Sequence, residues 1–411
     1  MSEKSIKEFA RIIKTFSSNS TSYLPICNIS FFLGAGFSKA WDQRSPIGSE
    51  LFDLNTSTDL NAKKYDVFKL PDLLSQFLIS HDYYSVRPHP KELQLKDIMY
   101  NLSMQLKYPD LRSRYIDAQN IQLIINEIKS FIQQKFENIT EINYFDEKLS
   151  RFPYPNNLNE DQRAILNFFK TILSDTYSDR SRGIYEGIRS DFITTNYDFT
   201  IETILNYIWG EDDSIFLYIY RGITPEEICG CHPYSRIVSH DYGLTKNLIK
   251  INGGFEILAN ENFYKLEYRK RKTEDILKNP PQIMLPNKEQ DYTDNYFKAV
   301  FPKAVRLLQE SQVLVIVGYS MPEEDSLIRI LLRQFAEKSE DLLFKNIFYI
   351  TGKERKNEDY EKTYDERYQK LKQLILSLYP YLNNKKQLLS SIFIYPGHFC
   401  DWAKGVIEEL T

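Results

Sequence analysis

The sequence predicts an α/β protein built on a doubly wound parallel (Rossmann-like) sheet with a large helical insertion. Short apolar runs of strand length recur along the chain, and those at residues 29–33, 313–317 and 346–350 stop at turns that contain glycine. Segments with apolar residues at helical spacing follow these runs. Strands that alternate with helices form parallel, doubly wound sheets, so these two observations together predict the fold.

The length of 411 residues exceeds that of one ordinary domain, so we expect a core domain with an added module. Helical patterns dominate the middle of the chain, at residues 70–79, 121–136 and 161–173. We therefore divide the chain into residues 1–53, which carry an N-terminal helix, the first strand and its glycine turn, a mainly helical insertion at 54–189, and the remainder of the sheet domain at 190–411.

Composition favours a folded protein without a general affinity for nucleic acid. Hydrophobic residues make up 42% of the chain and aromatic residues 14%, more than disordered chains contain. The 52 basic and 56 acidic residues nearly balance, at a net charge of −4, so direct nucleic-acid binding is not expected. The amphipathic, acid-containing start does not read as a signal peptide, and no apolar run approaches a membrane span. We expect a cytoplasmic protein that has no membrane contact.

Two surface segments leave alternatives open. The N-terminal apolar residues Ile6, Phe9, Ile12, Ile13 and Phe16 are spaced as on a helix that packs on the core or on a partner subunit. The charged stretch 263–279 is interpreted as a solvated helix face, with binding of a partner or polyanion as the alternative.

The cysteines predict neither a disulfide framework nor a metal centre. Four in a long chain is normal for a reducing compartment. Cys229-Gly230-Cys231-His232, with the distant His398 and Cys400, has the residue types of a zinc site but lacks the paired C-x2-C spacing. We therefore predict buried thiols and a loop histidine, and no metal.

The central motif is the turn after the first strand, at Gly34-Ala35-Gly36-Phe37-Ser38. Small residues let a backbone approach a ligand closely, and a helix that begins near Phe37 and Ser38 would direct its free amides at a phosphate. Lys39 occupies the place of the third glycine of the dinucleotide fingerprint, so a tight turn without a ligand is the alternative. Ser38 either caps the helix or contacts phosphate.

Three further strand ends carry polar or glycine residues. In open α/β sheets, ligands bind at the carboxyl ends of the strands, so these residues are candidates for the same site. They are Thr194-Thr195-Asn196-Tyr197-Asp198, Gly318-Tyr319-Ser320 and Thr351-Gly352-Lys353. The last group is placed where the adenine half of a dinucleotide would be expected.

Three blocks, in their order and flanking strands, resemble the NAD-binding blocks of the sirtuin family, and are most similar to its bacterial antiphage branch. The blocks are residues 34–38, 194–198 and 318–322. The resemblance implies NAD as substrate or ligand, a loop with Pro46 beside the nicotinamide ribose, and Ser320 and Asp325 on the adenosine side. Sirtuin deacetylases carry a four-cysteine zinc ribbon, and its absence here points away from that branch.

The resemblance also implies two catalytic positions. Asn196 matches the family asparagine, whereas Asn252-Gly253 stands where the family has His-Gly. Asparagine can hydrogen-bond a ribose hydroxyl but cannot take a proton at neutral pH, so His240 in a nearby loop is the alternative base. Asp198 either orients the ribose or Asn196, or caps the following helix.

The resemblance leads to the expectation of an NAD hydrolase that releases nicotinamide and ADP-ribose and acts as an abortive-infection effector in bacterial antiviral defence. Such effectors work as homo-oligomers or with a co-encoded sensor, such as a translocase-type ATPase or a nucleotide-processing enzyme, so we expect weak activity of the isolated chain. The alternative, which the loss of histidine at Asn252 supports, is an inactive sensor of NAD or ADP-ribose that controls a partner.

Overall fold

The structure is a computed structural model, and its description covers about 70% of the chain. The described residues are 2–17, 27–54, 70–80, 95–111, 118–140, 144–146, 148, 157–173, 177–179, 184–209, 219–220, 222–223, 225–229, 246–260, 263–288, 294–322, 325–337, 345–352, 360–379 and 391–411.

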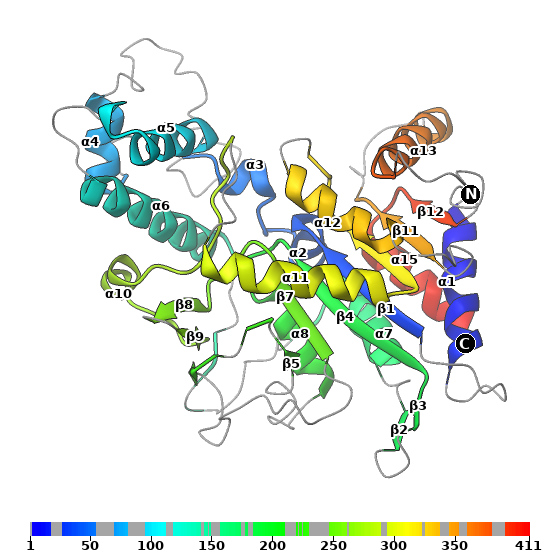
Figure 1. The fold of residues 1–411 in the computed structure, drawn as a ribbon. Helices are drawn as coiled ribbons and strands as arrows, with labels where there is room; N and C mark the ends of the chain where they lie inside the picture. Colours follow the sequence, from blue (N-terminus) through cyan, green and yellow to red (C-terminus); the bar gives the residue numbers. More distant parts are fainter. Residues whose placement is uncertain are drawn as a thin grey trace.

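A seven-stranded parallel sheet forms the centre of the described protein (Figure 1). Its order is β12-β11-β10-β1-β4-β7-β5. The strands are β1 (Cys27–Leu33), β4 (Ile188–Thr194), β5 (Ile219–Tyr220), β7 (Lys246–Lys250), β10 (Val313–Val317), β11 (Asn346–Ile350) and β12 (Ile392–Tyr395). The predicted parallel sheet is confirmed.

The strand order is that of a doubly wound, Rossmann-like sheet. From β1 the chain builds β4 and β7 on one side and then β10, β11 and β12 on the other. This is the 3-2-1-4-5-6 arrangement, with β5 added at one edge. The direction of building reverses between β1 and β10, and at such a reversal α/β proteins bind their ligands.

Helices cover both faces because alternate residues of each buried strand point to opposite sides. On β1, Phe31 and Leu33 belong to one buried cluster and Phe32 to the other. The first face carries α1 (Ser2–Phe16), α2 (Ala35–Trp41), α7 (Glu160–Leu173), α8 (Thr200–Trp209) and α15 (Phe399–Leu410). The second carries α11 (Asn295–Glu310), α12 (Ser326–Glu337) and α13 (Tyr360–Ser377).

A mainly helical module extends the second face at one end of the sheet (Figure 1). The long helix α6 (Ala118–Ile139) contacts α3 (Gly48–Leu51), α4 (Asp72–Ser80), α5 (Leu95–Lys107) and α10 (Thr273–Lys278). A small sheet of β6 (Glu227–Cys229), β9 (Phe263–Glu267) and β8 (Ile257–Asn260) lies next to it. The remaining elements are the 3-10 helix η2 (Pro109–Leu111) and the hairpin of β2 (Tyr177–Asp179) and β3 (Ile184–Glu186).

Within the predicted insertion, the last helix differs from the others in its packing. Helix α7 lies under the main sheet, where Phe168 and Phe169 pack with Phe31 and the α15 residue Trp402. The module thus takes α4 to α6 from this part of the chain, together with α10 and the small sheet from its later part.

The N-terminal helix packs on the protein's own core. Phe9, Ile12 and Ile13 of α1 are buried, and the indole of Trp402 donates a hydrogen bond of 3.0 Å to Ser5. The predicted helix is confirmed, with the core as its partner. Among the described helices, none combines the length and apolar character that a membrane crossing requires.

Three local predictions were wrong. Helix α2 begins at Ala35, two residues before the expected start, and Gly34 is its N-cap residue. The sequence pattern favours a helix start at Pro322, because proline is tolerated in the first turn, but the helix after β10 begins at Ser326. The charged stretch 263–279 forms β9 and α10 and not one helix, because β9 pairs with β8 on one side and with β6 on the other.

Candidate functional site

The turns after β1 and β10 cross backbone to backbone at the reversal point of the sheet. The Gly36 amide donates to the Gly318 carbonyl at 2.9 Å, and the Gly34 amide donates to Val317 at 2.9 Å. A Cβ built on Gly318 would lie 2.4 Å from the Gly36 carbonyl carbon, and Gly318 has a φ of +63°. Glycine is therefore required here by the packing of the two turns.

A buried hydrogen-bond cluster joins the ends of β1 and β4. The Asn196 side-chain nitrogen donates to the Gly34 carbonyl at 2.9 Å and to the Ser38 hydroxyl at 2.8 Å. Ser38 in turn donates to Asp198 Oδ2 at 2.7 Å. Three candidate residues from two distant blocks therefore meet at the carboxyl edge of the sheet.

The cluster fixes which end of the Asn196 amide is available to a ligand. Both amide hydrogens are engaged, whereas Oδ1 accepts no hydrogen bond from any described residue. Asn196 is half-buried, and an amide oxygen accepts hydrogen bonds from water or a hydroxyl. The arrangement presents one oriented acceptor at the strand end.

Asp198 contacts both Ser38 and the start of α8, and it reaches Asn196 only through the Ser38 hydroxyl. Its Oδ1 accepts from the Thr200 amide at 2.8 Å at the start of α8, while Oδ2 holds Ser38. Ser38 lies inside α2, so it does not cap that helix, and its hydroxyl joins Asn196 to Asp198.

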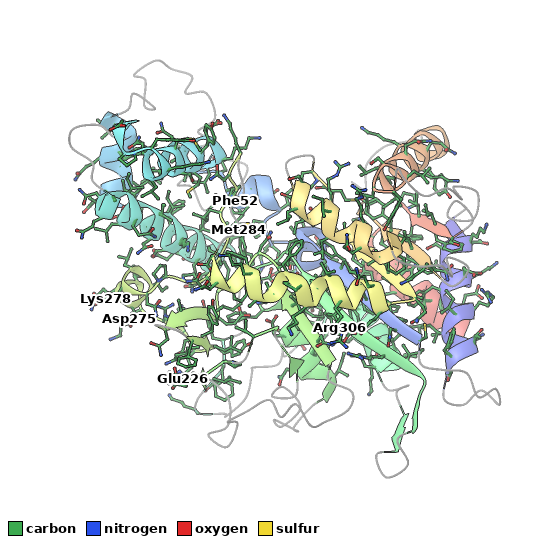
Figure 2. The ribbon with its side chains drawn as sticks, viewed as in Figure 1. Phe52, Glu226, Asp275, Lys278, Met284 and Arg306 are labelled. Atoms are coloured by element: carbon green, nitrogen blue, oxygen red, sulfur yellow. The ribbon has the colours of Figure 1, made fainter. Side chains whose placement is uncertain are left out.

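Neighbouring residues anchor the strand end that carries Asn196. The Thr194 hydroxyl donates to the Leu33 carbonyl at 2.9 Å and accepts from the backbone N–H of Asn196 at 3.0 Å. The backbone N–H of Thr195 donates to the Leu33 carbonyl at 3.1 Å. Tyr197 points into the core, where its hydroxyl donates to the carbonyl of Met284. Its ring packs 6.2 Å from that of Phe52, and Figure 2 places Phe52 and Met284 between the helical module and the sheet.

The glycine turn offers fewer amides to a phosphate than the motif predicts. The amide of Gly36 is engaged by Gly318, and the amide of Phe37 donates to Gly34 at 2.8 Å. Ala35 is half-buried, and Pro46 is buried in the loop before α3. In this arrangement the Gly36 and Phe37 amides do not face a ligand.

Asn252 and Gly253 follow β7, next to the end of β4. Gly253 has a φ of +81°, and a Cβ there would lie 1.8 Å from the Gln282 carbonyl oxygen, so this glycine is structural. The Asn252 side-chain oxygen is buried and accepts no hydrogen bond from the described residues. A buried acceptor of this kind is a place for an ordered water or a ligand hydroxyl.

The turn after β10 is held from within the protein. The Tyr319 hydroxyl donates to Asp325 Oδ2 at 2.7 Å, and the Tyr349 hydroxyl donates to the Tyr319 carbonyl at 2.9 Å. Met321 adopts a φ of +54°, a conformation that side chains rarely adopt, whereas Ser320 is exposed. Among the candidate residues of this turn that the structure describes, Ser320 alone is exposed.

Thr351 and Gly352 lie at the end of β11, beside the start of α15. A Cβ on Gly352 would lie 3.9 Å from His398 Nδ1, and His398 Nε2 is buried without a hydrogen-bond partner in the described residues. The sequence indicates His398 only as a candidate metal ligand. His240 and Lys353 lie outside the described residues.

Cys27 and Cys400 are buried free thiols. Burial raises the pKa of Cys27 to about 12, and burial with the nearby Asp161 and Asp401 does the same for Cys400. No group of three metal-ligating side chains occurs in the parts of the chain that the structure describes. Cys231 and His232 lie outside those parts.

A buried ion cluster beneath the site was not predicted. Lys250 of β7 pairs with Glu202 at 2.8 Å and with Glu256 at 2.9 Å. The available signal was a lysine between the apolar residues Ile249 and Ile251, and a glutamate on the apolar side of a helix.

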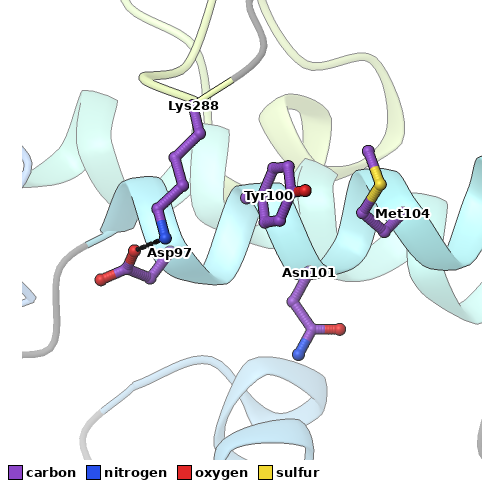
Figure 3. A pocket seen from close by; sticks show the side chains of 5 residues that line it. All are labelled: Asp97, Tyr100, Asn101, Met104 and Lys288. Carbon is purple, nitrogen blue, oxygen red and sulfur yellow. Dashed lines mark ion pairs between the residues drawn. The ribbon is translucent and has the colours of Figure 1, made fainter.

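An open hollow occurs elsewhere, on the helical module (Figure 3). Lys288 pairs with Asp97 at 2.7 Å and lies 5.4 Å from the ring centre of Tyr100. Asn101 and Met104 complete its lining. It contains none of the candidate residues at the strand ends.

The sheet order and the polar strand-end cluster define an α/β protein of the Rossmann-like, doubly wound class. Comparison of the sequence with protein-family models and with curated proteins finds no match in either.

Proposed function

We propose that this protein binds NAD at the carboxyl edge of its sheet and hydrolyses the bond between nicotinamide and ribose. The observation that carries the proposal is the oriented Asn196 amide, whose nitrogen is held by Gly34 and Ser38 while its oxygen accepts nothing from the described residues. The site lies beside the reversal point of the sheet, where dinucleotides bind in this class of fold.

The proposed reaction uses the asparagine to place a nucleophile. The N-glycosidic bond breaks and its electron pair leaves with nicotinamide, which becomes neutral, while positive charge develops on the ribose. A water oxygen forms the new bond to the same ribose carbon and its proton passes to solvent, giving ADP-ribose. Asn196 Oδ1 accepts a hydrogen bond from this water or from a ribose hydroxyl and so orients it.

Asn252 supports the alternative function. It occupies the position of the histidine in the sirtuin-like pattern, and an amide cannot take a proton from water. A protein that binds NAD or ADP-ribose without turnover would act as a sensor and control a partner.

The proposal includes a role in bacterial defence, which depends on the sequence resemblance alone. An NAD hydrolase would be toxic if it were always active, so we propose control by self-association or by a co-encoded partner. Infection of cells that carry the gene with its neighbour, or with Asn196→Ala, tests this role through survival and cellular NAD.

The direct test is incubation of the purified protein with NAD, alone and with the product of the neighbouring gene. Nicotinamide release is followed by chromatography, and binding of NAD and ADP-ribose by calorimetry. Release that disappears in Asn196→Ala supports hydrolysis. Binding without release under all conditions supports the sensor, and the absence of both refutes an NAD site. Asn126→Ala, on the exposed side of α6, is the matched control.

A further inference from the structure

The buried ion cluster beneath the site contains two carboxylates and one ammonium. Lys250, Glu202 and Glu256 are 2%, 0% and 1% exposed, and they come from β7, α8 and the turn after β7. Buried charges of this kind are retained only where they are paired and hydrogen-bonded.

The Lys250 ammonium donates its third hydrogen bond to the backbone just after Asn196. Two of its hydrogens serve Glu202 and Glu256, and the third is donated to the backbone carbonyl of Asp198 at 2.7 Å. The Tyr197 carbonyl lies at 3.4 Å and the Phe199 ring centre at 5.1 Å. The lysine therefore holds the segment that immediately follows Asn196.

The chain leaves space for this contact at Gly254. A Cβ on Gly254 would lie 2.3 Å from Glu256 Oε2 and 2.7 Å from Lys250 Cδ. A side chain at position 254 would therefore collide with the Lys250–Glu256 ion pair, so glycine is needed there.

The protonation state of the lysine is consistent with this role. Burial alone would lower the pKa of Lys250, but the carboxylates of Glu202 and Glu256 outweigh it and raise the pKa above the ordinary value of a lysine. The ammonium stays charged at neutral pH, with all three hydrogens engaged.

We propose that Lys250 is a positioning residue that fixes the Tyr197-Asp198 backbone and thereby holds the Asn196 amide in its oriented state. The consequence for turnover rests on the proposed function, whereas the consequence for the Asn196 amide does not. Misplacement of a reacting group by about 1 Å lowers rates by about a hundredfold.

A second buried lysine, Lys345, lies next to a strand of the same sheet and supplies a matched control. Lys345 precedes β11 and donates to the carbonyls of Gln309 and Ser311 at 2.9 and 2.5 Å, so it also ties backbone segments together. These carbonyls end α11 at the opposite, amino edge of the sheet. Lys345→Met therefore removes a similar lysine without touching the Asn196 segment.

Because Lys250→Met alone leaves two buried carboxylates without a cation, the test uses the uncharged variant Lys250→Met/Glu202→Gln/Glu256→Gln. Asparagine is labelled with nitrogen-15, and the Asn196 side-chain signal is assigned by its loss in Asn196→Asp. Exchange of the two Asn196 amide hydrogens with solvent is measured in the wild type, the triple variant and Lys345→Met. Nicotinamide release is measured on the same samples.

We expect the Asn196 amide hydrogens to be protected in the wild type and in Lys345→Met, and to lose this protection in the triple variant. We also expect kcat to fall by about a hundredfold in the triple variant while KM changes by less than about threefold. Retained protection of Asn196 in the triple variant overturns the proposal, as does an equal loss in Lys345→Met. If the wild type releases no nicotinamide, the exchange result still decides the positioning role, and only the proposed function fails.

Discussion

The amide of Gly36 donates a hydrogen bond of 2.9 Å to the carbonyl oxygen of Gly318, which joins turns that are 282 residues apart in the chain. This contact lies at the reversal point of the sheet, where a bound dinucleotide would otherwise account for the glycines. The packing of the two turns is enough to explain why glycine occurs at these positions. Asn196 is therefore better evidence for a ligand site than the glycines are.

We expect Gly318→Ala to lower the free energy of unfolding by about 3 kcal/mol or more, because the new methyl group would meet the Gly36 backbone at a φ of +63°. Denaturant unfolding of the variant measures this. Gly48→Ala is the control, since its Cβ would find its nearest neighbour, a Phe52 ring atom, at 3.9 Å. Equal stability of Gly318→Ala and the wild type would contradict the described crossing.

Asn196→Ala is expected to lower nicotinamide release by about a hundredfold to a thousandfold, because the oriented acceptor is lost. Asn252→Ala should have a smaller effect if Asn196 is the central group. Initial rates at saturating NAD measure both variants. A larger loss in Asn252→Ala than in Asn196→Ala would move the catalytic assignment to the end of β7.

Ser38→Ala should lower the free energy of unfolding by about 1–3 kcal/mol, since it removes one hydrogen-bond partner from the buried carboxylate of Asp198 and one from the side-chain amide of Asn196. Ser377→Ala removes an exposed hydroxyl and should change it by less than about 0.5 kcal/mol. Urea titrations of the two variants provide the measurement. Similar stabilities in both would show that the cluster is not formed in solution.

Lys345 predicts a pH dependence of stability. Burial lowers its pKa to about 8, whereas in an unfolded chain the pKa is about 10.4. Between these values the unfolded state binds a proton that the native state does not, so stability rises with pH. The free energy of unfolding of the wild type relative to Lys345→Met should therefore increase by about 2 kcal/mol from about pH 8 to pH 9.5. A constant difference over this interval would rule out a lowered pKa.

The thiols of Cys27 and Cys400 should not react in the native protein. Burial raises the pKa of both to about 12, so the reactive thiolate is scarce at about pH 8. In Cys229→Ser/Cys231→Ser, a chromogenic disulfide reagent should report no rapid thiol before denaturation and two afterwards. Rapid native labelling of either cysteine would show that its segment opens readily.

The strands could be predicted where burial on both faces makes the sequence continuously apolar, as at Val313–Val317 and Asn346–Ile350, whose bounds were found as expected. Helix α11 was missed because Pro302 lies inside it, and an interior proline normally indicates a break. Helix α13 was missed because charged residues fill its sequence and leave little amphipathic pattern.

The meeting of Ser38, Asn196 and Asp198 followed from one rule, that parallel strands bring their carboxyl ends to the same edge. What the sequence could not indicate was how those side chains pair. It also could not distinguish a glycine that faces a ligand from one that faces another backbone, as at Gly36 and Gly318.

The central position of β1 constrains how the protein folds during synthesis. Its neighbour β4 leaves the ribosome about 160 residues later and β10 about 280 residues later, while α1 must wait for α15 near residue 400. Because the chain emerges from its amino end, the surfaces of α1 and β1 that these later elements cover stay exposed until those elements have been made. We therefore expect truncated nascent chains to need chaperone protection, and the native sheet to close only after β10 has been made.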